Sequence, residues 1–294
     1  MSAALLAVII ALSLGHFLPQ LASLRRYGPL WAWHSAVLAR IGTVARDEWS
    51  GVLLVLVVPA LLLALLLAGL ARVLFGLPEF VLSVFVLFLC WGPRDLDRDL
   101  DALRLADDPV AVQRATMQLG APAAEGAELV PALFRAALSR WFGVLFWFLV
   151  LGAPGALLYR WQRLLAEEMP PRGDSPRARL QTWLDWPAAQ LMTLALAIAA
   201  NFDAVFHAWR DWHRARGHWW VADIGFLDAA ARTSVTIELA EAAEEAEVAP
   251  PADAVIVAPT PHGAAVRDAQ SLIWRLLIVW LTVLALFVLA GITH

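Results

Sequence analysis

Tyr159 and Arg160 are polar residues that could bind a ligand beside an interrupted apolar run. They follow the sequence GAPG at positions 152–155, which breaks that run. Glycine and proline free backbone hydrogen-bonding groups, and irregular backbone is tolerated at membrane depth where it lines a polar cavity. We therefore predict that this tyrosine and arginine bind a ligand. An interfacial tyrosine beside an arginine that extends to the headgroups is the alternative interpretation.

A second polar group, Arg94, Asp95 and Asp99, directly follows an apolar run that ends at Trp91. A guanidinium and carboxylates in this position are suited to a phosphate-bearing head or an ion. The structural alternative is a juxtamembrane anchor in which aspartate and arginine pair along one helix. Each such pair stabilises a helix by about 0.2–0.5 kcal/mol.

A third group, Asp185, Asn201 and Asp203, brackets the apolar stretch 188–206. An aspartate at the centre of a membrane costs about 2.5–3.5 kcal/mol. If this stretch crosses the bilayer, its polar residues need partners and mark a functional site. If it packs at the surface, they are ordinary polar residues at the end of a helix.

The composition excludes several kinds of chemistry. All 22 basic residues are arginines, so a P-loop, a Schiff-base lysine and a Ser–Lys dyad are absent. Cys90 is the one cysteine, which excludes disulfides and cysteine-based zinc sites. We predict no metal and no cofactor, because the spacing of His207, His213 and His218 does not place them on one helix face. The net charge of −4 gives no reason to expect a nucleic-acid partner.

The apolar runs place the chain in a membrane. It is 61% hydrophobic and 16% charged, whereas soluble domains have roughly 45–50% apolar and about 25% charged residues. We predict an all-α, polytopic integral membrane protein with four to five hydrophobic helical segments and cytoplasmic helical loops. Its strongest candidate spans, each near the ~20 residues needed to cross, are 52–70, 74–91, 141–159 and 272–290. The segments 3–18 and 188–206 are ambiguous.

The arginines indicate how the segments are oriented. Positive residues concentrate in cytoplasmic loops, which places 20–50 and 93–140 in the cytoplasm of a bacterial cell, with the spans in its inner membrane. A full crossing by 141–159 would export the five arginines that lie between 160 and 179. We therefore expect a broken or shallow helix there. The side occupied by 161–186 stays open.

The predicted organisation has three parts. A helical membrane domain covers 1–228 and includes the loop 93–140, an acidic helix with a flexible Pro/Ala-rich tether covers 229–265, and a last transmembrane helix covers 266–294. Within the loop, Asp108 and Pro109 are typical of a helix start, and Gly120 of its end. Before that helix, the leucines at 96, 100 and 103 share one face, and Asp95, Arg98 and Asp99 are expected to turn elsewhere.

Three stretches carry a resemblance to a known family. They read WGPRDLDRDL at 91–100, WFGVLFWFLVLGAPGALLYRWQRLL at 141–165 and RLQTWLDWPAAQLMTLALAIAANFDAVFHAW at 179–209. Together they resemble the AmpE family, inner-membrane proteins linked to β-lactamase induction, which is similar in turn to the CobD/CbiB membrane enzymes of cobalamin assembly. The resemblance covers roughly 50–225 and, more loosely, the last span.

The resemblance implies a regulatory role and leaves an enzymatic alternative. We predict an AmpE-like membrane sensor linked to cell-wall recycling and the β-lactamase response, with no catalysis evident. Its partners would be the lipid bilayer and a cell-wall-recycling or membrane protein, in an unknown oligomeric state. The alternative is a CobD/CbiB-like enzyme acting on a phosphate- or amide-bearing substrate; a transporter is less favoured, because no inverted repeat is found.

The chain departs from the CobD/CbiB pattern at two motifs. That family carries G-R-D-T where residues 120–130 read GAPAAEGAELV, and E-S-x-x-E-N-x-x-D where residues 137–146 read ALSRWFGVLF. Such carboxylates and amides would hold Mg²⁺ and orient phosphates. Their replacement puts corrinoid ligation in doubt.

Overall fold

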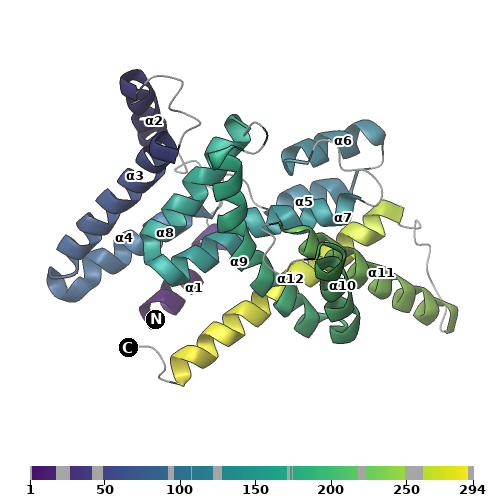
Figure 1. Ribbon diagram of the computed structural model, residues 1–294. Coiled ribbons are helices and arrows are strands. Elements are labelled where there is room, and N and C mark those ends of the chain that lie inside the picture. The colour runs from purple at the N-terminus through teal and green to yellow at the C-terminus, as the bar shows by residue number, and fades with distance from the viewer. Residues whose placement is uncertain are drawn as a thin grey trace. The chain divides into compact units, whose positions relative to one another are not determined.

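The computed structural model describes residues 2–17, 27–41, 49–91, 96–106, 108–121, 128–170, 173, 175–217, 223–248 and 261–290. All regular secondary structure among these residues is helical (Figure 1). The predicted all-α fold is therefore confirmed. Arg94 and Asp95, two of the predicted site residues, lie outside the described residues.

The helices follow one another along the chain with short connections. They are α1 (Ser2–Phe17), α2 (Gly28–Ile41), α3 (Trp49–Leu70), the 3₁₀ turn η3 (Leu74–Gly76), α4 (Leu77–Cys90), α5 (Leu96–Arg104), α6 (Pro109–Gln118), α7 (Leu129–Ala137), the π-helical turn η5 (Leu138–Phe142), α8 (Gly143–Glu168), α9 (Pro176–Ala199), α10 (Phe202–Ala215), α11 (Gly225–Val248) and α12 (Pro261–Leu289).

Five apolar helical segments match the predicted four to five. Three are long and apolar enough to cross a membrane: Trp49–Leu70, Leu129–Glu168 and Gly263–Leu289. Two shorter ones are Ala3–Leu14 and Leu77–Cys90. The last helix begins at Pro261, so residues 261–265, predicted as part of a flexible tether, are helical, while residues 249–260 lie outside the described residues.

The helices divide between two compact units. The first contains 1–93, 139–185 and 283–294, and the second contains 94–138 and 186–282. In the first unit α4 contacts α1 and α8, and α3 contacts α8 and α2. In the second unit α11 contacts α7 and α10, and α5 contacts α6.

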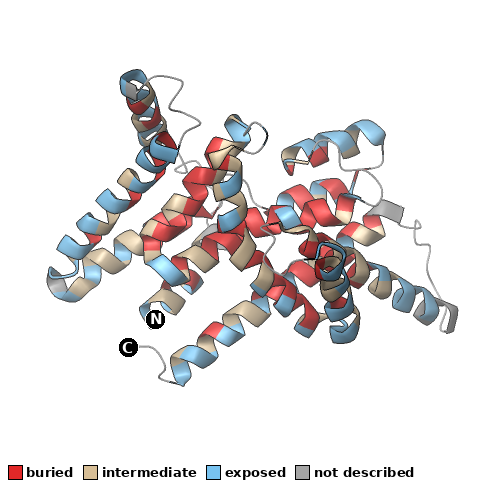
Figure 2. Ribbon diagram, in the orientation of Figure 1, coloured by how far each residue is buried: buried red, intermediate tan, exposed pale blue. Residues whose placement is uncertain are grey.

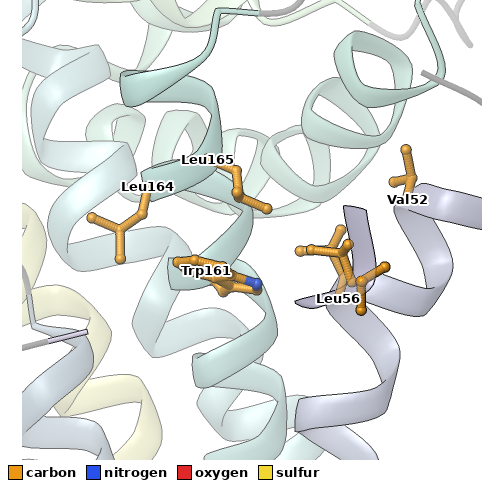
Figure 3. Close-up of a cluster of buried hydrophobic side chains, with 7 residues drawn as sticks. Val52, Leu56, Trp161, Leu164 and Leu165 are labelled. Carbon is orange, nitrogen blue, oxygen red and sulfur yellow. The ribbon is translucent and has the colours of Figure 1, made fainter. Parts of the chain in front are cut away.

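The helix α3 buries one face and exposes the other (Figure 2). Val52, Leu56 and Ala60 recur at intervals of four and are buried, so they share one face of a helix with 3.6 residues per turn. Figure 3 shows Leu56 facing Trp161 of α8 in a shared hydrophobic cluster. On the other face Leu62 and others are more than half exposed, which is the pattern expected of a surface that contacts lipid acyl chains.

The second unit confirms one predicted face and corrects one residue on it. Leu96, Leu100 and Leu103 of α5 are each 0% exposed. Asp99 was expected to turn away from them, but it is 1% exposed. It lies three residues after Leu96 and four before Leu103, and residues at those spacings share a helix face. The expectation that Asp99 turns elsewhere was wrong.

The helix α6 begins and ends as its sequence predicts. The Asp108 side chain accepts a hydrogen bond from the backbone N–H of Ala111, and Pro109 occupies the first turn. Gly120 has a φ of 81°, a left-handed conformation that glycine adopts readily after a helix. A capping aspartate at this position is worth about 1 kcal/mol.

Candidate functional site

The helix α8 is broken at Gly152. This residue has φ 70° and ψ −159°, a combination essentially restricted to glycine. Pro154 then lies in the first turn after the break, where its missing N–H would have no helical partner anyway. The broken helix predicted for 141–159 is confirmed.

The two halves of α8 pack against each other. A Cβ atom at Gly143 would overlap the ring of Tyr159, and one at Gly155 would overlap the carbonyl oxygen of Trp147. In a straight helix Gly143 and Tyr159 would be about 24 Å apart, at 1.5 Å per residue. Their contact therefore requires α8 to fold back at Gly152 as a helical hairpin, with glycines at the close approaches.

A buried polar cluster ties the second half of α8 to α9. The Tyr159 hydroxyl donates a hydrogen bond to Oδ1 of Asp185 at 2.7 Å, and Nη1 of Arg163 donates to Oδ2 at 3.1 Å. Tyr159 is 0% exposed and Asp185 is 3% exposed. Burial raises the pKa of the Asp185 carboxyl above its ordinary value, and the Arg163 guanidinium opposes that rise.

Arg160 is buried beside this cluster and differs from it in its contacts. It is 1% exposed, and none of its three side-chain nitrogens has a hydrogen-bond partner among the described residues. Its ion pair with Glu167 spans 3.7 Å, which is too long for a hydrogen bond. The predicted pair Tyr159–Arg160 thus lies in the protein interior, and an interfacial tyrosine with an outward-reaching arginine does not describe it.

The structure brings Tyr159, Arg160 and Asp185 into the first unit and leaves the other predicted site residues elsewhere. Asp99 lies buried in the second unit. Asn201 accepts a hydrogen bond from the backbone N–H of Ala204 at 3.1 Å and caps α10. Asp203 is exposed in the first turn of α10.

The apolar stretch 188–206 is therefore two helices, with the end of α9 and the start of α10 meeting at Asn201. Asn201 and Asp203 are at a helix end, as the structural alternative describes, and no ligand contact is needed to explain them. His213 of α10 is also structural, since its ring stacks on Phe226 of α11 at 5.5 Å.

Sequence reasoning missed Arg163 and Glu167. Arg163 is four residues after Tyr159 and Glu167 is seven after Arg160, spacings that place each pair on one helix face. That signal was present in the sequence. The partner of Arg163 was not readable, because Asp185 comes from another helix.

A small cavity lies near the same end of α8. Its volume is about 20 Å³, and its polar wall is formed by His34, Gln162 and Arg177. Gln162 donates to the carbonyl oxygen of Arg177, while its own side-chain oxygen has no hydrogen-bond partner among the described residues. A space of this size holds about one water molecule. No group of three histidine, cysteine, aspartate or glutamate side chains in the described part of the chain is placed to hold a metal ion.

Comparison with known proteins gives one curated relative. The chain is 28% identical over 257 residues to the cobalamin biosynthesis protein CobD of Chromobacterium violaceum, and the match covers 80% of each chain. No family model and no solved structure matches it. The similarity supports the CobD/CbiB side of the predicted resemblance and gives no support to AmpE. With the apolar helices, it defines a CobD-like membrane protein.

Proposed function

We propose that this chain is a bacterial inner-membrane enzyme similar to CobD/CbiB that acts on a phosphate- or amide-bearing substrate in cobalamin assembly. The observation that carries this proposal is the similarity to a cobalamin biosynthesis protein across 80% of both chains. A match of that extent reaches from the apolar helices through the polar segments, so it is not confined to a shared membrane composition.

The cluster of Tyr159, Arg163 and Asp185 supports a substrate site in the first unit. Ionisable groups buried beside a broken membrane helix are costly, and in membrane proteins they usually mark a substrate or ion pathway. Tyr159 and Arg163 hold both oxygens of the Asp185 carboxylate. That leaves this carboxylate fixed in orientation, as a group that positions a bound substrate must be.

The residues at 120–130 and 137–146 constrain the proposal. They lack the acidic and amide residues of the CobD/CbiB motifs. We therefore assign the Tyr159–Asp185–Arg163 cluster to substrate binding and positioning, and assign no metal-dependent step to this chain. The regulatory AmpE-like role has no observation of its own in its favour.

Complementation tests the proposal. A bacterial strain that lacks its own CobD/CbiB protein needs added cobalamin for cobalamin-dependent growth, and expression of this chain is expected to remove that need. Tyr159→Phe and Asp185→Asn should reduce the rescue at least tenfold. Asn201→Ala, a cap variant remote from the cluster in sequence, should not.

The protein must be shown to reach the membrane in each strain, by immunoblotting of membrane fractions. Absence of rescue by wild-type protein that is present in the membrane would reject the assignment to cobalamin assembly. Full rescue by both cluster variants would reject the cluster as the substrate site.

A further inference from the structure

Arg160 is a buried guanidinium whose donors are unused. Its Nε, Nη1 and Nη2 atoms have no hydrogen-bond partner among the described residues, and the residue is 1% exposed. Arg177, which is also buried, donates to the carbonyl oxygens of Leu165 at 2.7 Å and Met169 at 3.0 Å. The contrast shows that this fold can satisfy a buried arginine, and that it does not do so at Arg160.

An unsatisfied guanidinium is expensive. It carries five N–H donors in a planar fork, and a buried charge without a partner destabilises a fold strongly. The neighbouring Arg163 offers no relief, because it is a cation paired with Asp185. Folded proteins keep such a group where a ligand completes its contacts.

Glu167 is the described carboxylate nearest to relieving Arg160. It lies seven residues later, two turns along the same face of α8, and its Oε2 is 3.7 Å from Nη2 of Arg160. The Glu167 side chain is 47% exposed. It can therefore swing into water at little cost and leave the guanidinium to another anion.

We propose that Arg160 binds an oxyanion that carries one negative charge, a phosphate-type group held by the guanidinium fork, and that Glu167 competes with it. Arg163 and Asp185 cancel each other's charge, so one positive charge remains at Arg160. The planar fork matches two oxygens of a phosphate group. The inference deepens the proposed function by naming the chemistry of the ligand, and it rests on that function only for the ligand's identity.

Thermal unfolding of the purified protein in dodecyl maltoside, an uncharged detergent, tests the site. Added inorganic phosphate is expected to raise the midpoint temperature in a saturable way, because a ligand that binds only the folded state stabilises it. Phosphatidylglycerol mixed into the micelles, in a separate titration, distinguishes a lipid phosphate from a soluble one. A response to neither anion would overturn the proposal.

Two variants of the site make the test specific. Arg160→Met should abolish the response and raise the midpoint without phosphate, because it removes an unsatisfied buried charge. Glu167→Gln should lower the apparent Kd for phosphate by about fivefold or more, consistent with loss of a competing ion pair. Its matched control is Glu168→Gln, at the neighbouring exposed glutamate, which should leave the Kd unchanged.

Arg160→Lys covers the case in which the methionine variant does not fold. It keeps the charge and loses the fork, so the Kd should rise about tenfold with folding retained. An undiminished phosphate response in either Arg160 variant, or equal effects of Glu167→Gln and Glu168→Gln, would contradict the site.

These results separate from those on the proposed function. Phosphate binding that depends on Arg160, together with failed complementation, would reject only the assignment to cobalamin assembly. Successful complementation by Arg160→Met would reject only the anion site.

Discussion

Gly143 and Tyr159 are in contact across the two halves of α8, so closely that a Cβ atom at position 143 would overlap the tyrosine ring. The contact fixes the helical hairpin and holds the Tyr159 hydroxyl where it reaches Asp185. A glycine with no catalytic group thus determines the position of a candidate site residue.

Gly143→Ala is expected to destabilise the protein by about 1–3 kcal/mol, the usual cost of forcing extra atoms into a packed core. Thermal unfolding in detergent would measure it. Gly69→Ala is the control, since Gly69 is helical and no atom would contact the added Cβ. Equal midpoints for the two variants would show that the hairpin is not packed as described.

The Arg163–Asp185 pair is expected to behave as a buried ion pair. Asp185→Asn leaves a guanidinium that is 19% exposed without its counter-ion and should cost about 3–5 kcal/mol. Replacing both residues by leucine should recover most of the loss, because the unpaired charge is then gone. The measurement is a double-mutant cycle by thermal unfolding, and strict additivity of the two single changes would contradict the pairing.

In the second unit, the ion pair between Arg135 of α7 and Asp228 of α11 should matter more than the pair between Glu128 and Arg232. The Asp228 side chain is 7% exposed, whereas Glu128 is 60% exposed. Asp228→Asn is expected to cost about 2 kcal/mol, and Glu128→Gln less than about 1 kcal/mol. Chemical denaturation of the two variants would compare them, and a larger loss for Glu128→Gln would be the contrary result.

Asn201 is expected to act only as a helix cap. Asn201→Ala should lower stability by about 1 kcal/mol, and Asn201→Asp, which keeps a side-chain acceptor, should match the wild type. Thermal unfolding reports both changes. A loss of complementation with unchanged stability would instead restore Asn201 as a functional residue.

The hairpin also predicts on which side of the membrane the chain continues after α8. If the chain turns back at Gly152, residues 110 and 175 lie on the same side. Single cysteines introduced as Val110→Cys and Ser175→Cys in a Cys90→Ala background should therefore react alike with a membrane-impermeant maleimide in intact cells. Opposite labelling would mean that the segment crosses completely.

The sequence was sufficient for the apolar helices and for the position of the break. Long runs without charge predict membrane helices, and the glycines and proline at 152–155 predict an interruption. Asp99 was misjudged because a charged residue predicts exposure, although its spacing from Leu96 and Leu103 places it on their face.

The candidate site was predictable only in part. Tyr159 and Arg160 could be singled out because they follow the break. The pairing of Tyr159 and Arg163 with Asp185 depends on the packing of α8 against α9, and no local pattern encodes a contact between separate helices. The burial of Asp185 and the capping role of Asn201, which bracket the same apolar stretch, became distinguishable only in the fold.

The break at Gly152 has a consequence for biogenesis. The stretch from Gly143 to Leu151 extends about 14 Å as a helix, roughly half of the 30 Å hydrocarbon layer. It cannot be released into the bilayer as an independent crossing. The insertion machinery would have to retain it until synthesis has reached at least Tyr159, so that both arms partition together, and a chain truncated shortly after the break would be a substrate for quality-control proteolysis.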